Sequence, residues 1–256
     1  MPKTNSAFIS EVFSSIQGEG LYVGVRQVFV RFAGCNLACS YCDTPASRSL
    51  KPELCAIQDR IGEQVFRRVR NPLDVDAVAS TVARLEDEAP GHHSVSLTGG
   101  EPLMQATFLS KLCPELQKLG MRTYLESNGT LVDALAELLP HLHIVAMDFK
   151  LESATGVAPD TELHREFLSA AVAAEKGVFV KVVVSASTPE EEIEEAAAVM
   201  ALAGRRIPLV IQPLTAVCED AEPPSAEQLM QLQIAASRLL EDVRVIPQCH
   251  KLAGLI

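Results

Sequence analysis

Short apolar runs and longer amphipathic segments alternate along most of the chain. Residues 74–88 place Val75, Val78, Val82 and Leu85 at the spacing of one helix face, whereas residues 178–184 form a short apolar run typical of a buried strand. The pattern predicts strands at residues 8–13, 27–32, 94–97, 121–125, 143–147, 178–184, 208–211 and 243–246. It predicts helices at residues 74–88, 103–119, 131–139, 163–176, 189–202 and 225–240.

Strand and helix alternate about six times, and the strands are too apolar for a sheet with one wet face, so the pattern predicts a parallel sheet covered by helices. In such α/β folds the chemistry gathers at the carboxyl ends of the strands. Polar motifs follow five of the predicted strands: a cysteine-rich loop, Thr-Gly-Gly-Glu, Glu-Ser-Asn-Gly, Asp-Phe-Lys and Gln-Pro-Leu. A doubly wound sheet would gather its sites near one switch point, so we predict a partial TIM-like barrel of the β6/α type around one cavity.

We expect residues 1–256 to form a single domain. Residues 46–73 show poor periodicity and are interpreted as an insertion after the cysteine-rich loop, packed over that side of the barrel. Within it, the basic run at residues 67–70 is expected to be a solvated helix end. Residues 243–256 supply a last strand and a tail.

Composition narrows the classes of function. The net charge of −11 disfavours direct binding to nucleic acid, because such binding usually depends on a basic surface. No apolar run is long enough to span a membrane, and the first residues lack the pattern of a secretory signal. Seven cysteines, three of them in one loop, fit a reducing cytoplasm better than a compartment where disulfides form. A small-molecule substrate is therefore the better expectation.

Three cysteines, Cys35, Cys39 and Cys42, lie within eight residues directly after a predicted strand. A structural zinc ion takes four protein ligands, so a zinc site would have to borrow a distant His or Cys. An iron–sulfur cluster is normally held by four thiolates, and a cluster held by three keeps one iron open to another ligand. Either metal site explains this close spacing better than the hypothesis of three buried structural cysteines.

This cysteine spacing, with an aromatic residue before the last cysteine, resembles the signature of the radical S-adenosylmethionine (SAM) superfamily. The resemblance implies a 4Fe-4S cluster whose open iron binds the amino and carboxylate groups of SAM, and a 5′-deoxyadenosyl radical that abstracts a hydrogen atom from the substrate. Gly99, Gly100 and Glu101 resemble the Gly-Gly-Glu motif of the superfamily, which implies that the Glu101 carboxylate pairs with the SAM ammonium group.

Four segments resemble the 7-carboxy-7-deazaguanine synthase family more closely: residues 14–20, 31–37, 42–44 and 247–251. The resemblance implies conversion of 6-carboxy-5,6,7,8-tetrahydropterin to 7-carboxy-7-deazaguanine with loss of ammonia, in the biosynthesis of queuosine and other 7-deazapurines. It also implies a Mg²⁺ ion held by the Thr44 hydroxyl, a reductant such as flavodoxin or ferredoxin, and a homodimer. The alternatives are an activating enzyme for a glycyl-radical enzyme and a non-catalytic zinc-binding protein.

The resemblance also assigns the remaining site residues. Cofactor-binding residues are Tyr41, Cys42, Asp43, Gly100, Glu101, Ser127, Asn128, Asp148, Phe149, Lys150, Gln212, Pro213, Leu214 and Thr215. Substrate-binding residues are Ile16, Gln17, Gly18, Glu19, Arg31, Thr98, His250 and Ile256, with the tail closing the site. Arg31 is expected to pair with the substrate carboxylate. For Lys150 an ion pair with Asp148 or Glu152 is an equally acceptable interpretation.

Overall fold

A curved sheet forms the centre of the computed structural model, which describes residues 5–39, 42, 44–215 and 222–255. In this part of the chain ten strands form one sheet, in the order β12-β11-β10-β9-β8-β7-β3-β2-β4-β5. The seven strands from β12 to β3 are mutually parallel, so their carboxyl ends share one edge of the sheet. These strands are β3 (Arg26–Phe32), β7 (Ser94–Gly99), β8 (Thr123–Ser127), β9 (Ile144–Phe149), β10 (Gly177–Val184), β11 (Leu209–Pro213) and β12 (Val243–Val245).

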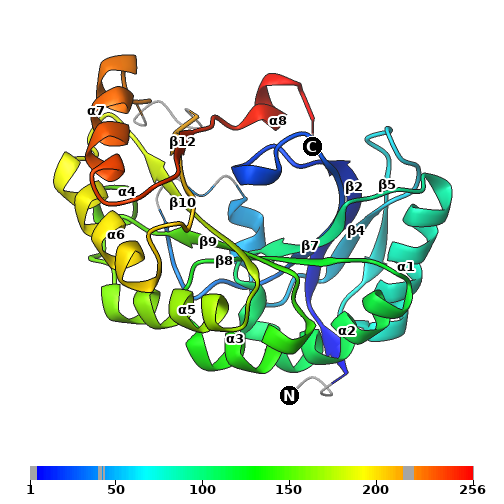
Figure 1. Ribbon diagram of the computed structural model, residues 1–256. Helices are drawn as coiled ribbons and strands as arrows, with labels where there is room; N and C mark the ends of the chain where they lie inside the picture. Colours follow the sequence, from blue (N-terminus) through cyan, green and yellow to red (C-terminus); the bar gives the residue numbers. More distant parts are fainter. Residues whose placement is uncertain (1–4, 40–41, 43, 216–221, 256) are drawn as a thin grey trace.

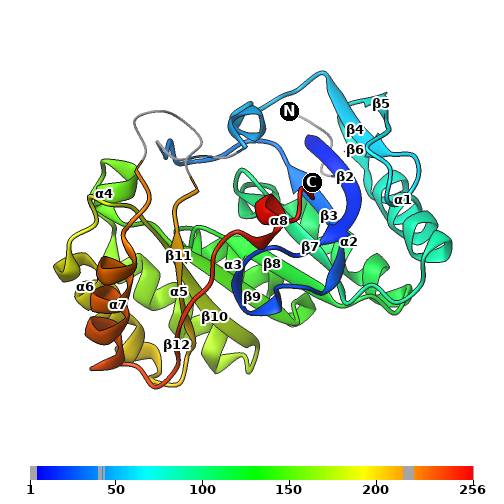
Figure 2. The ribbon, with the colours of Figure 1, turned by 90° about the horizontal axis from the view of Figure 1, so that it is seen from above.

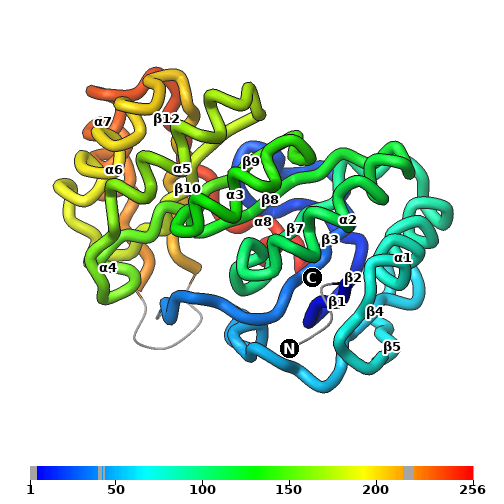
Figure 3. Tube along the Cα trace, turned by 90° about the horizontal axis from the view of Figure 1, so that it is seen from below, coloured from blue at the N-terminus to red at the C-terminus, as the bar shows by residue number. Residues whose placement is uncertain are grey.

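Long helices cover the convex face of this sheet and leave the concave face open (Figure 1). They are α1 (Val75–Glu88), α2 (Ala106–Lys118), α3 (Val132–Leu138), α5 (Thr161–Ala173), α6 (Glu190–Ala203) and α7 (Ala226–Ser237). The view from below shows these helices following one another around the outside (Figure 3). Among the described residues, no helix is both long and apolar enough to cross a membrane. This arrangement confirms the predicted partial barrel.

Alternation along the parallel strands separates two apolar clusters. Side chains such as Leu97, Leu125 and Val180 are fully buried in the main core between sheet and helices. The intervening residues Tyr124 and Phe179 belong to a second cluster on the concave face, which also packs against the 3₁₀ helix η1 (Gly20–Tyr22). This second cluster fills the amino-terminal end of the barrel, so a cavity is left at the carboxyl-terminal end.

The weakly periodic segment at residues 46–73 contains two strands that extend the sheet. β4 (Leu54–Gln58) pairs in parallel with β2 (Ile9–Ile16), and β5 (Phe66–Arg70) pairs antiparallel with β4 at the edge of the sheet. The prediction of a helix end at residues 67–70 is therefore wrong. At a sheet edge arginines can point to solvent, while Phe66 packs against the Phe13 ring at a centroid distance of 6.5 Å. Strands of five residues are too short to produce a clear alternation.

Shorter elements join these layers. They are β1 (Ser6–Ala7), β6 (Leu73–Asp74), α4 (Glu152–Thr155), α8 (Cys249–Leu252), η2 (Pro45–Arg48), η3 (Pro102–Gln105) and η4 (Leu139–His141). The carboxyl-terminal helix α8 lies on the concave side of the sheet, beside the amino-terminal strand β2 (Figure 2). The Cys249 amide donates to the Gly18 carbonyl at 2.9 Å. A Cβ atom on Gly18 would lie 2.3 Å from His250 Nδ1, so only glycine permits this contact.

Candidate active site

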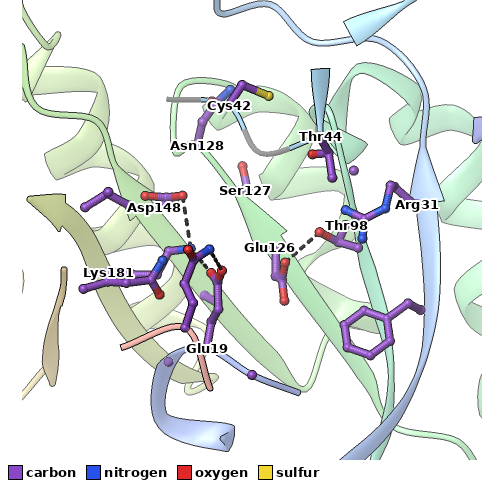
Figure 4. Close-up of a pocket in the computed structure, with 18 of the residues that line it drawn as sticks. Glu19, Arg31, Cys42, Thr44, Thr98, Glu126, Ser127, Asn128, Asp148 and Lys181 are labelled. Atoms are coloured by element: carbon purple, nitrogen blue, oxygen red, sulfur yellow. Dashed lines mark hydrogen bonds and ion pairs between the residues drawn. The ribbon is translucent and has the colours of Figure 1, made fainter. Parts of the chain in front are cut away.

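A cavity of about 470 Å³ occupies the concave side at the carboxyl ends of the parallel strands. The cysteine-rich loop forms one wall, and the loop at residues 16–20 together with α8 forms another. Strands β7 to β11 supply polar side chains to the cavity, and Figure 4 shows Thr98, Glu126, Asp148 and Lys181 pointing into it. The polar strand ends identified in the sequence therefore meet in one place.

The three clustered cysteines all border this cavity as free thiols. Burial raises the pKa of Cys35 and Cys39, so both thiols favour the protonated form until a metal binds them. Within the described residues, no three His, Cys, Asp or Glu side chains converge closely enough to hold a single metal ion. In an iron–sulfur cubane each thiolate binds a different iron, so the three thiols that border the cavity suit the cluster that the sequence predicts.

A carboxylate, Glu126 of β8, is held in a fixed orientation on the cavity wall. It accepts hydrogen bonds from Gln17 Nε2 at 2.9 Å and from Thr98 Oγ1 at 2.6 Å. The second N–H of the Gln17 side chain donates to Gln27 Oε1 at 2.9 Å, and its oxygen accepts from the Glu19 amide. Gln17 therefore orients Glu126 with both of its side-chain N–H groups used, and Glu126 presents its carboxylate to the cavity.

Charges of alternating sign cross the cavity floor beside Glu126. Lys181 of β10 pairs with Glu19 and lies 3.4 Å from Asp148, which also pairs with Lys150 at 2.6 Å. Burial alone would raise the pKa of Glu19, but the Lys181 ammonium and the hydrogen bond from Gln248 lower it to about 2. Burial would lower the pKa of Lys181, but Asp148 and Glu19 raise it well above its ordinary value. Glu19 and Lys181 therefore stay ionised at neutral pH.

The guanidinium of Arg31 lies at the other side of the cavity. Its Nε donates to Glu11 Oε2 at 3.0 Å, and its central carbon lies 5.7 Å from the centre of the Phe13 ring. The Phe13 ring in turn stacks on Phe29 at 5.1 Å. Arg31 is thereby fixed with its planar face packed, and in the described part of the chain its two Nη groups make no hydrogen bond, so they can bind an anion.

Glu101 lies beneath the cavity wall and does not border the cavity. Its carboxylate is fully buried and accepts from the Asn128 amide at 2.8 Å and from the Ser127 hydroxyl and the Leu103 amide at 3.0 Å. Burial raises the pKa of Glu101 to about 7. In this structure the carboxylate binds the chain's own donors, and its pairing with a ligand ammonium stays a prediction.

Gly100 serves a similar internal contact. A Cβ atom there would lie 2.0 Å from the Gly34 carbonyl oxygen, so the missing side chain lets β7 approach the backbone that leads into the cysteine-rich loop. The sequence predicted a close approach of a ligand at this glycine, and the structure adds a close approach of the chain itself.

Most of the predicted site residues border the cavity. They are Ile16, Gln17, Gly18, Glu19, Arg31, Cys35, Cys39, Cys42, Thr44, Thr98, Gly100, Ser127, Asn128, Asp148, Lys150, Gln212, Leu214, Thr215 and His250. Three others, Glu101, Phe149 and Pro213, do not. Phe149 and Pro213 each follow an inward-facing residue, so strand alternation turns them to the opposite face. Tyr41, Asp43 and Ile256 lie outside the described residues.

Lys181, Glu126 and Gln248 are among the polar residues of the cavity to which sequence reasoning assigned no role. Lys181 is the one charged residue in the apolar run at residues 178–184, and that exception was a usable signal. Glu126 stands two positions after the inward-facing Tyr124, so alternation also predicted its direction. Gln248 lies in the segment at residues 247–251 that resembles the family, but no role followed from it; its Nε2 donates to Glu19 Oε1 at 2.6 Å, 229 positions away in the chain.

Two acceptors on the cavity side of the sheet are buried without a hydrogen-bond partner among the described residues. They are Oδ1 of Asp148 and Oε1 of Gln212, at the ends of β9 and β11. Gln212 is 2% exposed, and an unpaired buried acceptor costs free energy. The cavity therefore offers two oriented acceptors to the hydroxyl or ammonium donors of a ligand.

Comparison with known proteins agrees with this geometry. Residues 29–157 match the family model of the radical SAM superfamily. A 7-carboxy-7-deazaguanine synthase from Geobacter sulfurreducens is 41% identical over 249 residues, covering 97% of each chain. One from Methanothermobacter thermautotrophicus is 37% identical, covering 96% of this chain and 97% of that protein. The crystal structure of QueE from Escherichia coli superimposes with a TM-score of 0.61 at 19% identity, covering 96% of this chain and 95% of that chain.

Proposed function

This chain belongs to the radical SAM superfamily and, within it, to the 7-carboxy-7-deazaguanine synthases, and from this premise we propose that it converts 6-carboxy-5,6,7,8-tetrahydropterin to 7-carboxy-7-deazaguanine with loss of ammonia. The observation that carries the proposal is the single cavity that joins two different sets of groups. Three free thiols lie on one side, and a carboxylate and an arginine, Glu126 and Arg31, lie on the other. A cofactor and a charged heterocycle can therefore meet there.

Cys35, Cys39 and Cys42 would hold a 4Fe-4S cluster with one iron open to SAM. When bound, the cluster and SAM supply the radical that abstracts hydrogen from the substrate. The protein's task is to orient SAM. The unpaired acceptors of Asp148 and Gln212 would receive its ribose hydroxyls or its ammonium group, and Leu214 would contact the adenine ring.

The substrate would occupy the side of the cavity nearer β2 and β7. Glu126 presents a carboxylate to the amino and ring N–H donors of the pyrimidine half of the pterin, which match its charge and acceptor capacity. The Nη groups of Arg31 would bind the substrate carboxylate as a planar fork. His250 and Gly18 would close the site, because α8 packs on the loop at residues 16–20.

We also propose that Thr44 ligates a Mg²⁺ ion together with oxygen atoms of the substrate. Mg²⁺ prefers oxygen ligands and keeps several of its waters, so one protein hydroxyl beside a bound carboxylate is a suitable site. Thr44 borders the cavity on the same side as Arg31 (Figure 4), which supports this placement.

Further proposals concern organisation and partners. We propose that residues 1–256 act as one domain in the cytoplasm, with residues 46–73 inserted and the tail at residues 243–256 closing the site. A flavodoxin or ferredoxin would reduce the cluster. A second copy would form a homodimer, for which the exposed apolar side chains Leu202, Met230 and Ile234 on α6 and α7 offer a surface. Light scattering measures the oligomeric state directly.

The experiment that tests the function is turnover by protein reconstituted with iron and sulfide under anaerobic conditions. With the carboxytetrahydropterin, SAM, Mg²⁺ and a chemical reductant, the proposal predicts 7-carboxy-7-deazaguanine by mass spectrometry. An activating enzyme for a glycyl-radical enzyme would instead cleave SAM and produce no deazapurine, and a zinc protein would neither bind iron as a cluster nor cleave SAM. Family membership favours neither alternative.

A further inference from the structure

Three side chains at the edge of the cavity form a closed ring of hydrogen bonds. Asn128 Nδ2 donates to Asn36 Oδ1 at 2.8 Å, and Asn36 Nδ2 donates to Thr130 Oγ1 at 2.8 Å. The Thr130 hydroxyl donates to Asn128 Oδ1 at 2.6 Å and completes the ring. Asn36 follows Cys35 directly in the chain, whereas Asn128 and Thr130 belong to the loop after β8. The ring therefore connects the cysteine-rich loop to the sheet.

The sheet side of this ring is firmly held. Asn128 is 5% exposed, its amide donates to the buried Glu101 carboxylate at 2.8 Å, and its carbonyl accepts from His164 Nε2 at 3.1 Å. His164 is itself buried and packs on Phe149 at a centroid distance of 4.3 Å, with the two rings tilted by 35°. Because Asn128 directly follows β8 and is held by Glu101, which follows β7, and by His164 of α5, Asn36 docks onto a rigid support.

Each polar atom of Asn128 takes part in these contacts. Its side-chain oxygen accepts from Thr130, its side-chain nitrogen donates one N–H to Asn36, and its backbone groups bind Glu101 and His164. A ligand donor could reach the Asn128 oxygen only in competition with Thr130, whereas the second N–H of Nδ2 can serve a ligand acceptor with the ring intact. The expectation that Asn128 binds SAM is therefore compatible with the ring through that second N–H.

We propose that the ring of Asn36, Asn128 and Thr130 is a positioning device that holds the amino-terminal part of the cysteine-rich loop in its metal-binding arrangement before the cluster arrives. Asn128 and Thr130 already form a local turn by themselves, through the Thr130 amide at 3.2 Å, so Asn36 is the member that transmits the constraint to Cys35. The inference rests on the proposed function only in taking the cysteine loop as the metal-binding segment. None of its tests requires turnover.

The first test is hydrogen exchange of the cluster-free protein. Replacing Asn36→Ala, Asn36→Asp or Thr130→Val opens the ring at a known place, and Thr107→Val, at an exposed position on α2, is the matched control. We expect backbone amides in residues 36–39 to exchange about fivefold faster in each ring variant, the effect of losing one neutral hydrogen bond. Exchange elsewhere should match the control. Unchanged exchange at residues 36–39 in the ring variants would overturn the proposal.

A second test follows the loop after reconstitution with iron and sulfide. We expect Asn36→Ala and Thr130→Val to lose iron to a chelator faster than Thr107→Val does, and the double variant Asn36→Ala/Thr130→Val to lose iron no faster than Asn36→Ala. Asn36→Ala already removes both hydrogen bonds that join the loop to the ring, whereas Thr130→Val leaves the one from Asn128, so the two effects must not add. Additive rates, or rates equal to the control, would contradict the ring.

These outcomes are distinguishable from failure of the proposed function. The exchange pattern and the non-additive iron loss without any deazapurine product would support the ring and refute the assigned substrate. Full turnover with neither pattern would refute the ring and support the assigned reaction.

Discussion

Replacing Lys181 by methionine tests the electrostatic organisation of the cavity most severely. Lys181 lies between two carboxylates, Glu19 and Asp148, and its side chain is 17% exposed. Methionine keeps the length and the apolar stem of the side chain and removes the charge. The variant therefore leaves two partly buried carboxylates without the Lys181 ammonium. Removing one partner of a buried ion pair destabilises the fold because the remaining charge stays buried and unpaired.

The magnitude follows from the pKa of Glu19, which falls from an ordinary value of 4.5 to about 2 in the folded protein. A shift of that size corresponds to about 3 kcal/mol of stability at neutral pH, since one pKa unit is worth about 1.4 kcal/mol. The side chains of Lys181 and Glu19 are 17% and 20% exposed, so solvent screens the pair and this value is an upper bound. Because the folded pKa is depressed, the contribution is present above pH 4.5 and is lost as the pH falls toward 2.

Loss of the Lys181 charge reverses this dependence. With burial no longer opposed, the pKa of Glu19 rises in the Lys181→Met variant, so protonation now favours its folded state. The stability difference between wild type and variant should therefore be about 2–3 kcal/mol at pH 7, and should shrink as the pH approaches 4. This value lies at the lower end of the range of roughly 3–5 kcal/mol for a broken buried pair, because both side chains are partly exposed. Urea unfolding of the cluster-free proteins at several pH values measures it.

The matched control is Lys51→Met, which removes a charge from an exposed position. Its effect on the free energy of unfolding should stay within about 0.5 kcal/mol at every pH. A Lys181→Met variant that resembles this control, or whose loss of stability does not change with pH, would refute the account of the cavity charges.

Four further predictions concern the cluster, the Mg²⁺ ion, the carboxyl-terminal helix α8 and the substrate. Cys39→Ala should fold, retain less iron after reconstitution and cleave no SAM; full cleavage would contradict the cluster assignment. Thr44→Ala should weaken the stimulation of turnover by Mg²⁺, and an unchanged metal dependence would remove Thr44 from that role. Gly18→Ala should displace α8, because its Cβ would lie 2.3 Å from His250, and limited proteolysis should then cut the tail at least severalfold faster than in wild type. Glu126→Gln should raise the KM for the pterin about tenfold or more with less effect on SAM binding; an unchanged KM would show that this carboxylate does not contact the substrate.

The sequence was sufficient to predict the barrel because two periodicities agreed along most of the chain. Helical spacing as in residues 74–88 and apolar strands as in residues 178–184 recur, and each strand and helix that the pattern predicts lies within about three residues of its expected place. The prediction failed at residues 66–70, where an exposed edge strand carries arginines on solvent-facing positions. Most residues of this strand are exposed, so no buried face requires apolar residues at alternate positions.

The candidate site was predictable where a side chain had to point inward and hard to predict where contacts are long-range. Strand parity distinguishes Asp148, which borders the cavity, from Phe149, which packs in the core. The resemblance to the family does not distinguish the two faces of a strand, so it assigned both Asp148 and Phe149 as cofactor-binding residues. The burial of Glu101 beneath Asn128 depends on the packing of β7 against β8, which no local pattern expresses. The contact between Gln248 and Glu19 depends on the return of the tail across the barrel.

The most direct measurement is a single anaerobic experiment on the reconstituted protein, with iron quantified, the reduced cluster observed by electron paramagnetic resonance and products identified by mass spectrometry. The account predicts about four irons per chain, a cluster signal that changes when SAM is added, and 7-carboxy-7-deazaguanine from the carboxytetrahydropterin. A cluster that binds and cleaves SAM yet leaves the pterin unchanged would contradict the assigned reaction, and the absence of any cluster signal would contradict the cavity's assignment as a radical SAM site.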